Sequence, residues 1–103
     1  MHFGTSCAPA AQKEFDRGVA LLHSFWFSAA IESFNTVLAG DPRCVMAHWG
    51  IAMSWWGNPF AGFRSSQALK AGLAATDAAR ASGAGTDREK AYVGAVDLLF
   101  RDA

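Results

Sequence analysis

The chain has 103 residues, 51% of them hydrophobic, and its nine basic residues are balanced by nine acidic ones. That length allows one small domain, and the apolar content predicts a packed core rather than a disordered chain. The balanced charge argues against nucleic acid or an anionic membrane surface as the partner, and no apolar run is long enough to predict a membrane span.

The first predicted helix covers residues 9–23, after an irregular lead-in over residues 1–8. Phe15, Val19 and Leu22 recur at the spacing of one helical face, with charged residues largely between them. Pro9 suits the first turn of a helix, because the N–H that it lacks would have no helical acceptor there. This pattern predicts an amphipathic helix.

A short bend at residues 24–27 leads into a second predicted helix over residues 28–39. The apolar side of this helix carries Ala30, Ile31, Phe34 and Leu38. We expect Gly40 to stop the helix in the left-handed conformation, and Asp41 and Pro42 to prevent its continuation.

The third predicted helix, over residues 43–56, is apolar on nearly every side. Its large apolar side chains are Val45, Met46, Trp49, Ile51, Met53, Trp55 and Trp56. A helix that is apolar all round needs partners on more than one face. We therefore expect other elements to pack on more than one side of it.

Glycine and proline predict a loop over residues 57–64, and an alanine-rich fourth helix follows over residues 65–82. Residues 83–85, Gly-Ala-Gly, end that helix. No segment shows the two-residue alternation of a strand. The predicted fold class is therefore all-α.

The fifth predicted helix spans residues 87–101 and begins with a capping motif. Thr86 and Glu89 match a capping box, in which the Thr86 side chain accepts from the first turn and Glu89 reaches back. Counting this element, we expect about five helices in antiparallel succession.

A shift of 34 positions overlays the first predicted helix on the third. Large side chains then fall on large ones and small on small: Phe15 on Trp49, Gly18 on Ala52, Val19 on Met53, Leu21 on Trp55 and Leu22 on Trp56. Two-helix units with a period of ~34 residues are typical of tetratricopeptide repeats. Such units stack, because none can bury its apolar face alone.

The first unit resembles the tetratricopeptide-repeat (TPR) family at four positions. Gly18 stands at the tight contact between paired helices, Ala30 and Phe34 reproduce the A-x-x-x-F element, and Pro42 closes the unit. Three positions depart from the usual Trp, Leu and Tyr of the family, and they are Glu14, Arg17 and Leu21.

The resemblance implies a short right-handed α-solenoid within one domain. The first repeat would cover residues 9–42, and a second, divergent repeat would cover residues 43–83 with a loop insertion at 57–64. Residues 86–101 would form the first helix of an incomplete third repeat. The first half is also similar to larger bacterial proteins of this family, so we expect the chain to be a fragment of one.

In that family the first helix of each unit lines a concave groove. By resemblance the groove would be lined by Gln12, Phe15, Val19, Leu22 and His23 from the first unit, and by Met46, Trp49, Met53 and Trp56 from the second. Such a groove would suit an apolar peptide, a partner helix or a greasy ligand. The alternative is that a second copy, or more of the same polypeptide, covers these residues. The resemblance implies a non-catalytic protein-interaction scaffold without a cofactor, and the uncovered apolar surface predicts self-association.

Catalytic signatures such as G-x-S-x-G, H-E-x-x-H and G-x-x-x-x-G-K-[S/T] do not occur in the sequence. The alternative function is that of a metal- or haem-binding exported protein, with ligands drawn from His2, His23, His48, Cys7, Cys44, Met46 and Met53. Cys44 and His48 share a helical face, but one pair makes no complete site. Packing of His48 among tryptophans, with methionines filling gaps in the core, explains the same residues.

Cys7 precedes the first helix of the first unit, and Cys44 lies at the start of the first helix of the second. In a stacked array these starts share one edge, with helix axes ~10 Å apart. A disulfide would pin the lead-in and would fit an exported or periplasmic protein whose signal peptide is missing here. Two free thiols, and with them a cytoplasmic protein, are the open alternative.

Overall fold

The structure is a computed structural model, and it describes residues 5–57 and 65–101. Regular secondary structure in these ranges consists of five helices, α1 (Pro9–His23), α2 (Phe27–Gly40), α3 (Val45–Trp56), α4 (Ser66–Ala81) and α5 (Asp87–Arg101). The prediction of an all-α chain with five helices is confirmed, and each predicted bound lies within two residues of the observed one. Most of the loop predicted at residues 57–64 lies outside the described residues.

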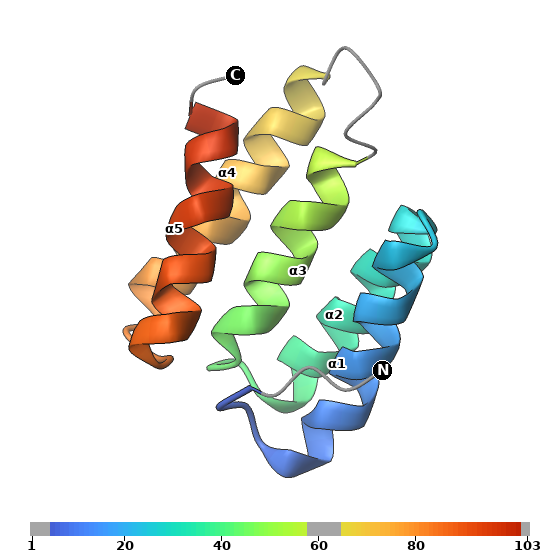
Figure 1. Cartoon of the computed structure of the whole chain (residues 1–103), viewed down its shortest axis with the longest axis vertical. Coiled ribbons are helices and arrows are strands. Elements are labelled where there is room, and N and C mark those ends of the chain that lie inside the picture. Colours follow the sequence, from blue (N-terminus) through green and yellow to red (C-terminus); the bar gives the residue numbers. More distant parts are fainter. Residues whose placement is uncertain (1–4, 58–64, 102–103) are drawn as a thin grey trace.

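The five helices succeed one another in antiparallel directions and form two layers (Figure 1). The helices α1, α3 and α5 form one layer, and α2 and α4 lie behind them (Figure 1). Among the described helices, contacts join only chain neighbours or helices of the odd-numbered layer, and α3 packs against all four others. This central position explains why the sequence of α3 is apolar on nearly every side.

The two helices of the rear layer bury equivalent positions. In α2 the buried residues are Ala30, Ser33, Phe34 and Val37. In α4 the residues 42 positions later, Gly72, Ala75, Thr76 and Ala79, are buried together with Ala68. The same helical face is therefore turned inward in both helices.

Phe34 fills the space between α1 and α3. Its ring is fully buried and packs at 5.6 Å, centroid to centroid, from the ring of Phe15. A Cβ atom added at Gly18 would lie 2.7 Å from the Phe34 ring, and one added at Gly50 would lie closer still. The predicted close approach at Gly18 is thus present, and Gly50 supplies a second one that the sequence reading did not identify.

The prediction for Gly40 is wrong, because α2 includes this residue in ordinary helical geometry. Positive φ angles at the described glycines occur at Gly57, Gly83 and Gly85. The helix ends one residue later, at Asp41, whose φ of −143° and ψ of 85° leave the helical region. The side chain of Asp41 then accepts hydrogen bonds from the backbone N–H groups of Ala8 and Arg43, at 2.8 and 3.3 Å.

The predicted capping box at the start of α5 is present. The Thr86 hydroxyl accepts from the backbone N–H of Glu89 at 3.2 Å, and the Glu89 carboxylate accepts from that of Thr86 at 2.9 Å. The same carboxylate accepts from Ser6, through its backbone N–H at 2.7 Å and through its hydroxyl. Glu89 therefore ties the lead-in to α5 while capping that helix.

A disulfide joins Cys7 to Cys44, with the two Cα atoms 4.8 Å apart. Both half-cystines belong to the same buried cluster as Phe15, Phe34 and Val45. Together with the contacts of Ser6 and Ala8, the bridge fixes the lead-in against α3, α5 and the end of α2.

Candidate functional site

The most prominent aromatic feature is the contact between α3 and α5. Trp49 meets Tyr92 edge to face with ring centroids 5.9 Å apart, and Trp56 meets Phe100 in the same manner at 5.1 Å. We call these four residues, together with Met53 about one turn from each tryptophan on α3, the aromatic seam. Edge-to-face pairs at such distances stabilise packing by more than the area they bury.

Helical spacing places the members of the seam. On α3, Trp49, Met53 and Trp56 are four and three positions apart, which puts them on one face. On α5, Tyr92 and Phe100 are two turns apart on the face that packs against α3. Met53 packs against both apolar clusters of the core, so it lies between the two aromatic pairs.

The seam keeps partial contact with solvent. Trp49, Met53, Trp56 and Tyr92 are half-buried, whereas Phe100 is buried. The Arg88 guanidinium lies 5.4 Å from the centroid of the Tyr92 ring, in cation–π contact at one end of the seam. The seam thus offers apolar, aromatic surface with a cation at one end.

The residues expected to line a concave groove divide into two groups. Phe15, Val19, Leu22 and Met46 are buried in the core. Their side chains have no surface with which to line a groove, because α1 packs against α2 and α3 and the lead-in joins the same core. Trp49, Met53 and Trp56 remain half-buried, Gln12 is half-buried, and His23 is exposed.

Two exposed apolar surfaces lie outside the residues predicted to line the groove. Phe25 and Trp26, in the turn between α1 and α2, are 54% and 67% exposed, and Phe25 has a positive φ of 61°. The run Phe25-Trp26-Phe27 was the available signal for this corner. On α5, Leu98 and Leu99 are 61% and 41% exposed.

A polar cluster joins α4 to α5 around the buried carboxylate of Asp97. This carboxylate accepts hydrogen bonds from the Thr76 hydroxyl at 2.7 Å, from Arg80 at 3.0 Å and from Arg101 at 2.7 Å. Burial raises the pKa of Asp97, but the hydrogen bonds from Arg101, Thr76 and Arg80 outweigh burial and hold the pKa below its ordinary value. The cluster is fully partnered, which is typical of a structural contact.

Glu89 is the second buried carboxylate. Burial raises its pKa, but the hydrogen bonds from Ser6 and Thr86, with the nearby charge of Arg88, outweigh burial and lower the pKa overall. Its hydrogen-bond donors all belong to the capping box or to the lead-in.

The candidate metal ligands are scattered. The sulfur atoms of Cys7 and Cys44 are bonded to each other, and Met46 is buried in the core. Burial lowers the pKa of His48 on α3. His2 lies outside the described residues, and within the described ranges no three His, Cys, Asp or Glu side chains are grouped to hold a metal ion.

Neither protein-family models, nor curated proteins, nor solved structures give a match to this chain. None of the described helices combines the length and apolar character needed to cross a membrane.

Proposed function

We propose that the chain is a non-catalytic interaction scaffold built from TPR-like helical hairpins, which binds an apolar peptide or a partner helix at the aromatic seam. The observation that carries the proposal is the seam itself, since it holds three half-buried aromatic residues and Met53 between two helices of the same layer. Aromatic and methionine side chains are enriched where proteins bind partners.

The order of the helices supports the repeat interpretation. Each hairpin packs only on its neighbour, and the buried positions of α2 recur in α4 after 42 residues. That interval exceeds the family's ~34 residues by the length of the loop insertion expected at 57–64. In a solenoid of this kind the first helices of successive units, here α1, α3 and α5, would share the binding face.

The rigidity of the surroundings supports a binding surface on α3. The helix is held by the disulfide at its start, by Phe34 against Gly50 and by all four other helices. A fixed surface loses little conformational entropy when a partner docks, which favours affinity.

Selection of displayed peptides against the intact chain tests the proposal. We expect the enriched peptides to carry apolar residues at helical spacing, and Trp49→Ala to weaken their binding by ~10-fold or more, as for an aromatic residue central to an interface. Trp26→Ala is the matched control, because it removes an exposed tryptophan that belongs to neither aromatic pair of the seam.

Circular dichroism of each variant would separate loss of binding from loss of fold. If Trp26→Ala weakens binding and Trp49→Ala does not, the binding surface is at the turn between α1 and α2. If both variants bind like the parent chain, the seam has no part in recognition.

A further inference from the structure

A pocket of about 320 Å³ lies where the turn between α4 and α5 passes the start of α3, and its lining includes no residue of the aromatic seam. Its apolar lining comes from Val45 of α3, Ala79 of α4, Ala84 of the turn and Val93 of α5. Val45, Ala79 and Val93 are almost fully buried, so they form a floor rather than a rim. The volume falls within the range of sites for small ligands.

Small residues keep this space open. Gly83 and Gly94 line the pocket, and a Cβ atom added at either position would meet no atom within 4 Å. Gly85, with a positive φ of 98°, brings the turn so close to α3 that its own added Cβ would lie 2.6 Å from the Val45 side chain. The turn thus closes one side of the pocket without filling it.

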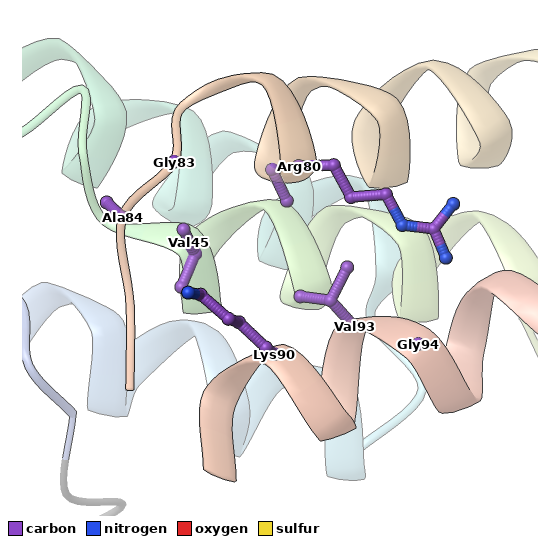
Figure 2. A pocket seen from close by; sticks show the side chains of 8 residues that line it. Val45, Arg80, Gly83, Ala84, Lys90, Val93 and Gly94 are labelled. Atoms are coloured by element: carbon purple, nitrogen blue, oxygen red, sulfur yellow. The ribbon is translucent and has the colours of Figure 1, made fainter. Parts of the chain in front are cut away.

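Two basic side chains line the same pocket. Figure 2 shows Lys90 rising from α5 toward Val45, and Arg80 extending from α4 toward the side of α5 that carries Val93 and Gly94. Arg80 donates to Asp97 through one nitrogen and is half exposed. Within the described part of the chain, Lys90 forms no ion pair.

The two charged residues that line the pocket, Arg80 and Lys90, are both basic. Asp97 is shared by Arg80 and Arg101, and Asp77 pairs with Arg101. Glu89 faces Ser6 and Thr86 instead of the pocket. The ammonium of Lys90, beside an apolar floor, therefore has no carboxylate to neutralise it among these groups.

We propose that this pocket binds a small amphipathic carboxylate, with its apolar chain on the floor and its carboxylate at the ammonium of Lys90. Burying the chain removes apolar surface from water, and the Lys90 ammonium supplies a charge-assisted hydrogen bond that a neutral analogue of the same size lacks. The proposal does not depend on the scaffold function, because the seam and the pocket share no residue.

Titration of the isotope-labelled chain with hexanoate, followed by two-dimensional amide NMR, tests the inference. We expect saturable shifts concentrated at Ala84, Val93 and Gly94. Hexanamide should bind about fivefold or more weakly because it has no charge, and acetate should bind as weakly because it has no apolar chain.

Two variants and one control sharpen the test. Lys90→Gln should weaken hexanoate by about fivefold or more, and Gly94→Leu should abolish the shifts by filling the pocket without a clash at its Cβ. Lys70→Gln, which removes an exposed cation of α4 outside the pocket, should leave the affinity unchanged.

The inference fails if hexanoate causes no localised shifts, or if hexanamide or acetate binds as well as hexanoate. It also fails if Lys70→Gln and Lys90→Gln weaken binding equally, since the effect would then reflect net charge. Unchanged binding in Gly94→Leu would place the ligand elsewhere.

Discussion

The two ends of the molecule differ in how an aromatic ring fills the space beside a helical glycine. Around α1 and α2, the Phe34 ring presses against Gly18 of α1 and Gly50 of α3. Around α4 and α5, the ring of Phe100 presses against Gly72 of α4. Both ends place a phenylalanine against a helical glycine, but the first phenylalanine belongs to the rear-layer helix α2 and the second to the front-layer helix α5 (Figure 1).

The ring comes from a different helix at the second end because Thr76 occupies the position of α4 equivalent to Phe34 of α2. Thr76 is fully buried but too small to fill the space that a phenylalanine fills, and its hydroxyl donates to Asp97. The first end is therefore held by apolar packing and a disulfide, and the second by a partnered carboxylate and one aromatic ring. Equivalent buried positions are thus stabilised by different chemistry at the two ends.

The largest effect is expected at Phe34. Phe34→Ala should lower the free energy of unfolding by ~3–5 kcal/mol, because it removes a fully buried ring that contacts both neighbouring helices. Urea denaturation measures the change. Arg17→Ala and Glu14→Ala, at less buried positions of α1, should cost ~0.5 kcal/mol or less. Similar losses in all three variants would mean that Phe34 does not anchor this end.

The second-largest loss of stability is expected on removing the disulfide. Replacing both Cys7 and Cys44 by serine should cost ~3–4 kcal/mol for a loop of this length, on the chain-entropy estimate. A reductant should destabilise the parent chain by a similar amount and leave the double variant unchanged. Thiol counting on the denatured, unreduced protein is the complementary check, and two reactive thiols per chain would contradict the bridge.

The helices could be predicted from the sequence because their signals are local. Apolar spacing, Pro9 and the Thr86–Glu89 pair lie within the elements that they define. The error at Gly40 is also local: glycine is permitted in a left-handed stop but not obliged to adopt it, and Asp41 ends the helix instead.

The candidate site was only partly predictable, because burial depends on segments far apart in the chain. Of the predicted groove, Trp49, Met53 and Trp56 lie in the aromatic seam. Phe15 and Met46 are instead buried in the core, to which Cys7 of the lead-in also belongs. The pocket was not predicted, because its lining comes from three helices and a turn that only the fold brings together.

A smaller effect is expected at Asp97. Asp97→Asn should lower stability near neutral pH by ~2 kcal/mol, as for a buried hydrogen bond to a charged group. Asp77→Asn, at an exposed ion pair with Arg101, should change stability by ~0.5 kcal/mol or less. Thermal unfolding of the two variants distinguishes them.

The pH dependence of the same pair has a definite sign. The pKa of Asp97 is lowered in the folded state, so its contribution to stability is present above the unfolded value of about 3.9 and is lost as pH falls through the folded pKa. The stability gap between parent chain and Asp97→Asn should therefore shrink with acidification. A gap that stays constant down to the acid transition would show that Asp97 acts through packing alone.

Glycine substitutions extend the comparison to α3 and α5. Gly50→Ala should cost about 1–3 kcal/mol, because the new methyl group would collide with the Phe34 ring. Gly94→Ala should instead stabilise by about 0.5–1 kcal/mol, since it meets open space and favours the helix. Denaturant midpoints measure both, and changes of the same sign would contradict the packing described here.

The smallest effect on stability is expected for substitutions at Leu98 and Leu99. At these positions the two ends of the molecule differ in their tendency to associate with a second copy. The glycine of α1 is covered by Phe34 of α2, whereas Gly94 of α5 meets nothing within 4 Å and these leucines stay exposed. Replacing both by glutamine should change stability by ~0.5 kcal/mol or less, because they are surface positions. It should nevertheless remove self-association, since contiguous exposed apolar surface drives contact between copies.

Light scattering over a range of concentrations should give the parent chain a mass that rises above 11.0 kDa and the double variant a constant mass. Trp26→Ser is the control for the other exposed corner. If it alone abolishes association, the contact lies at the turn between α1 and α2. A parent chain that stays monomeric at high concentration would show that α5 forms no contact with a second copy.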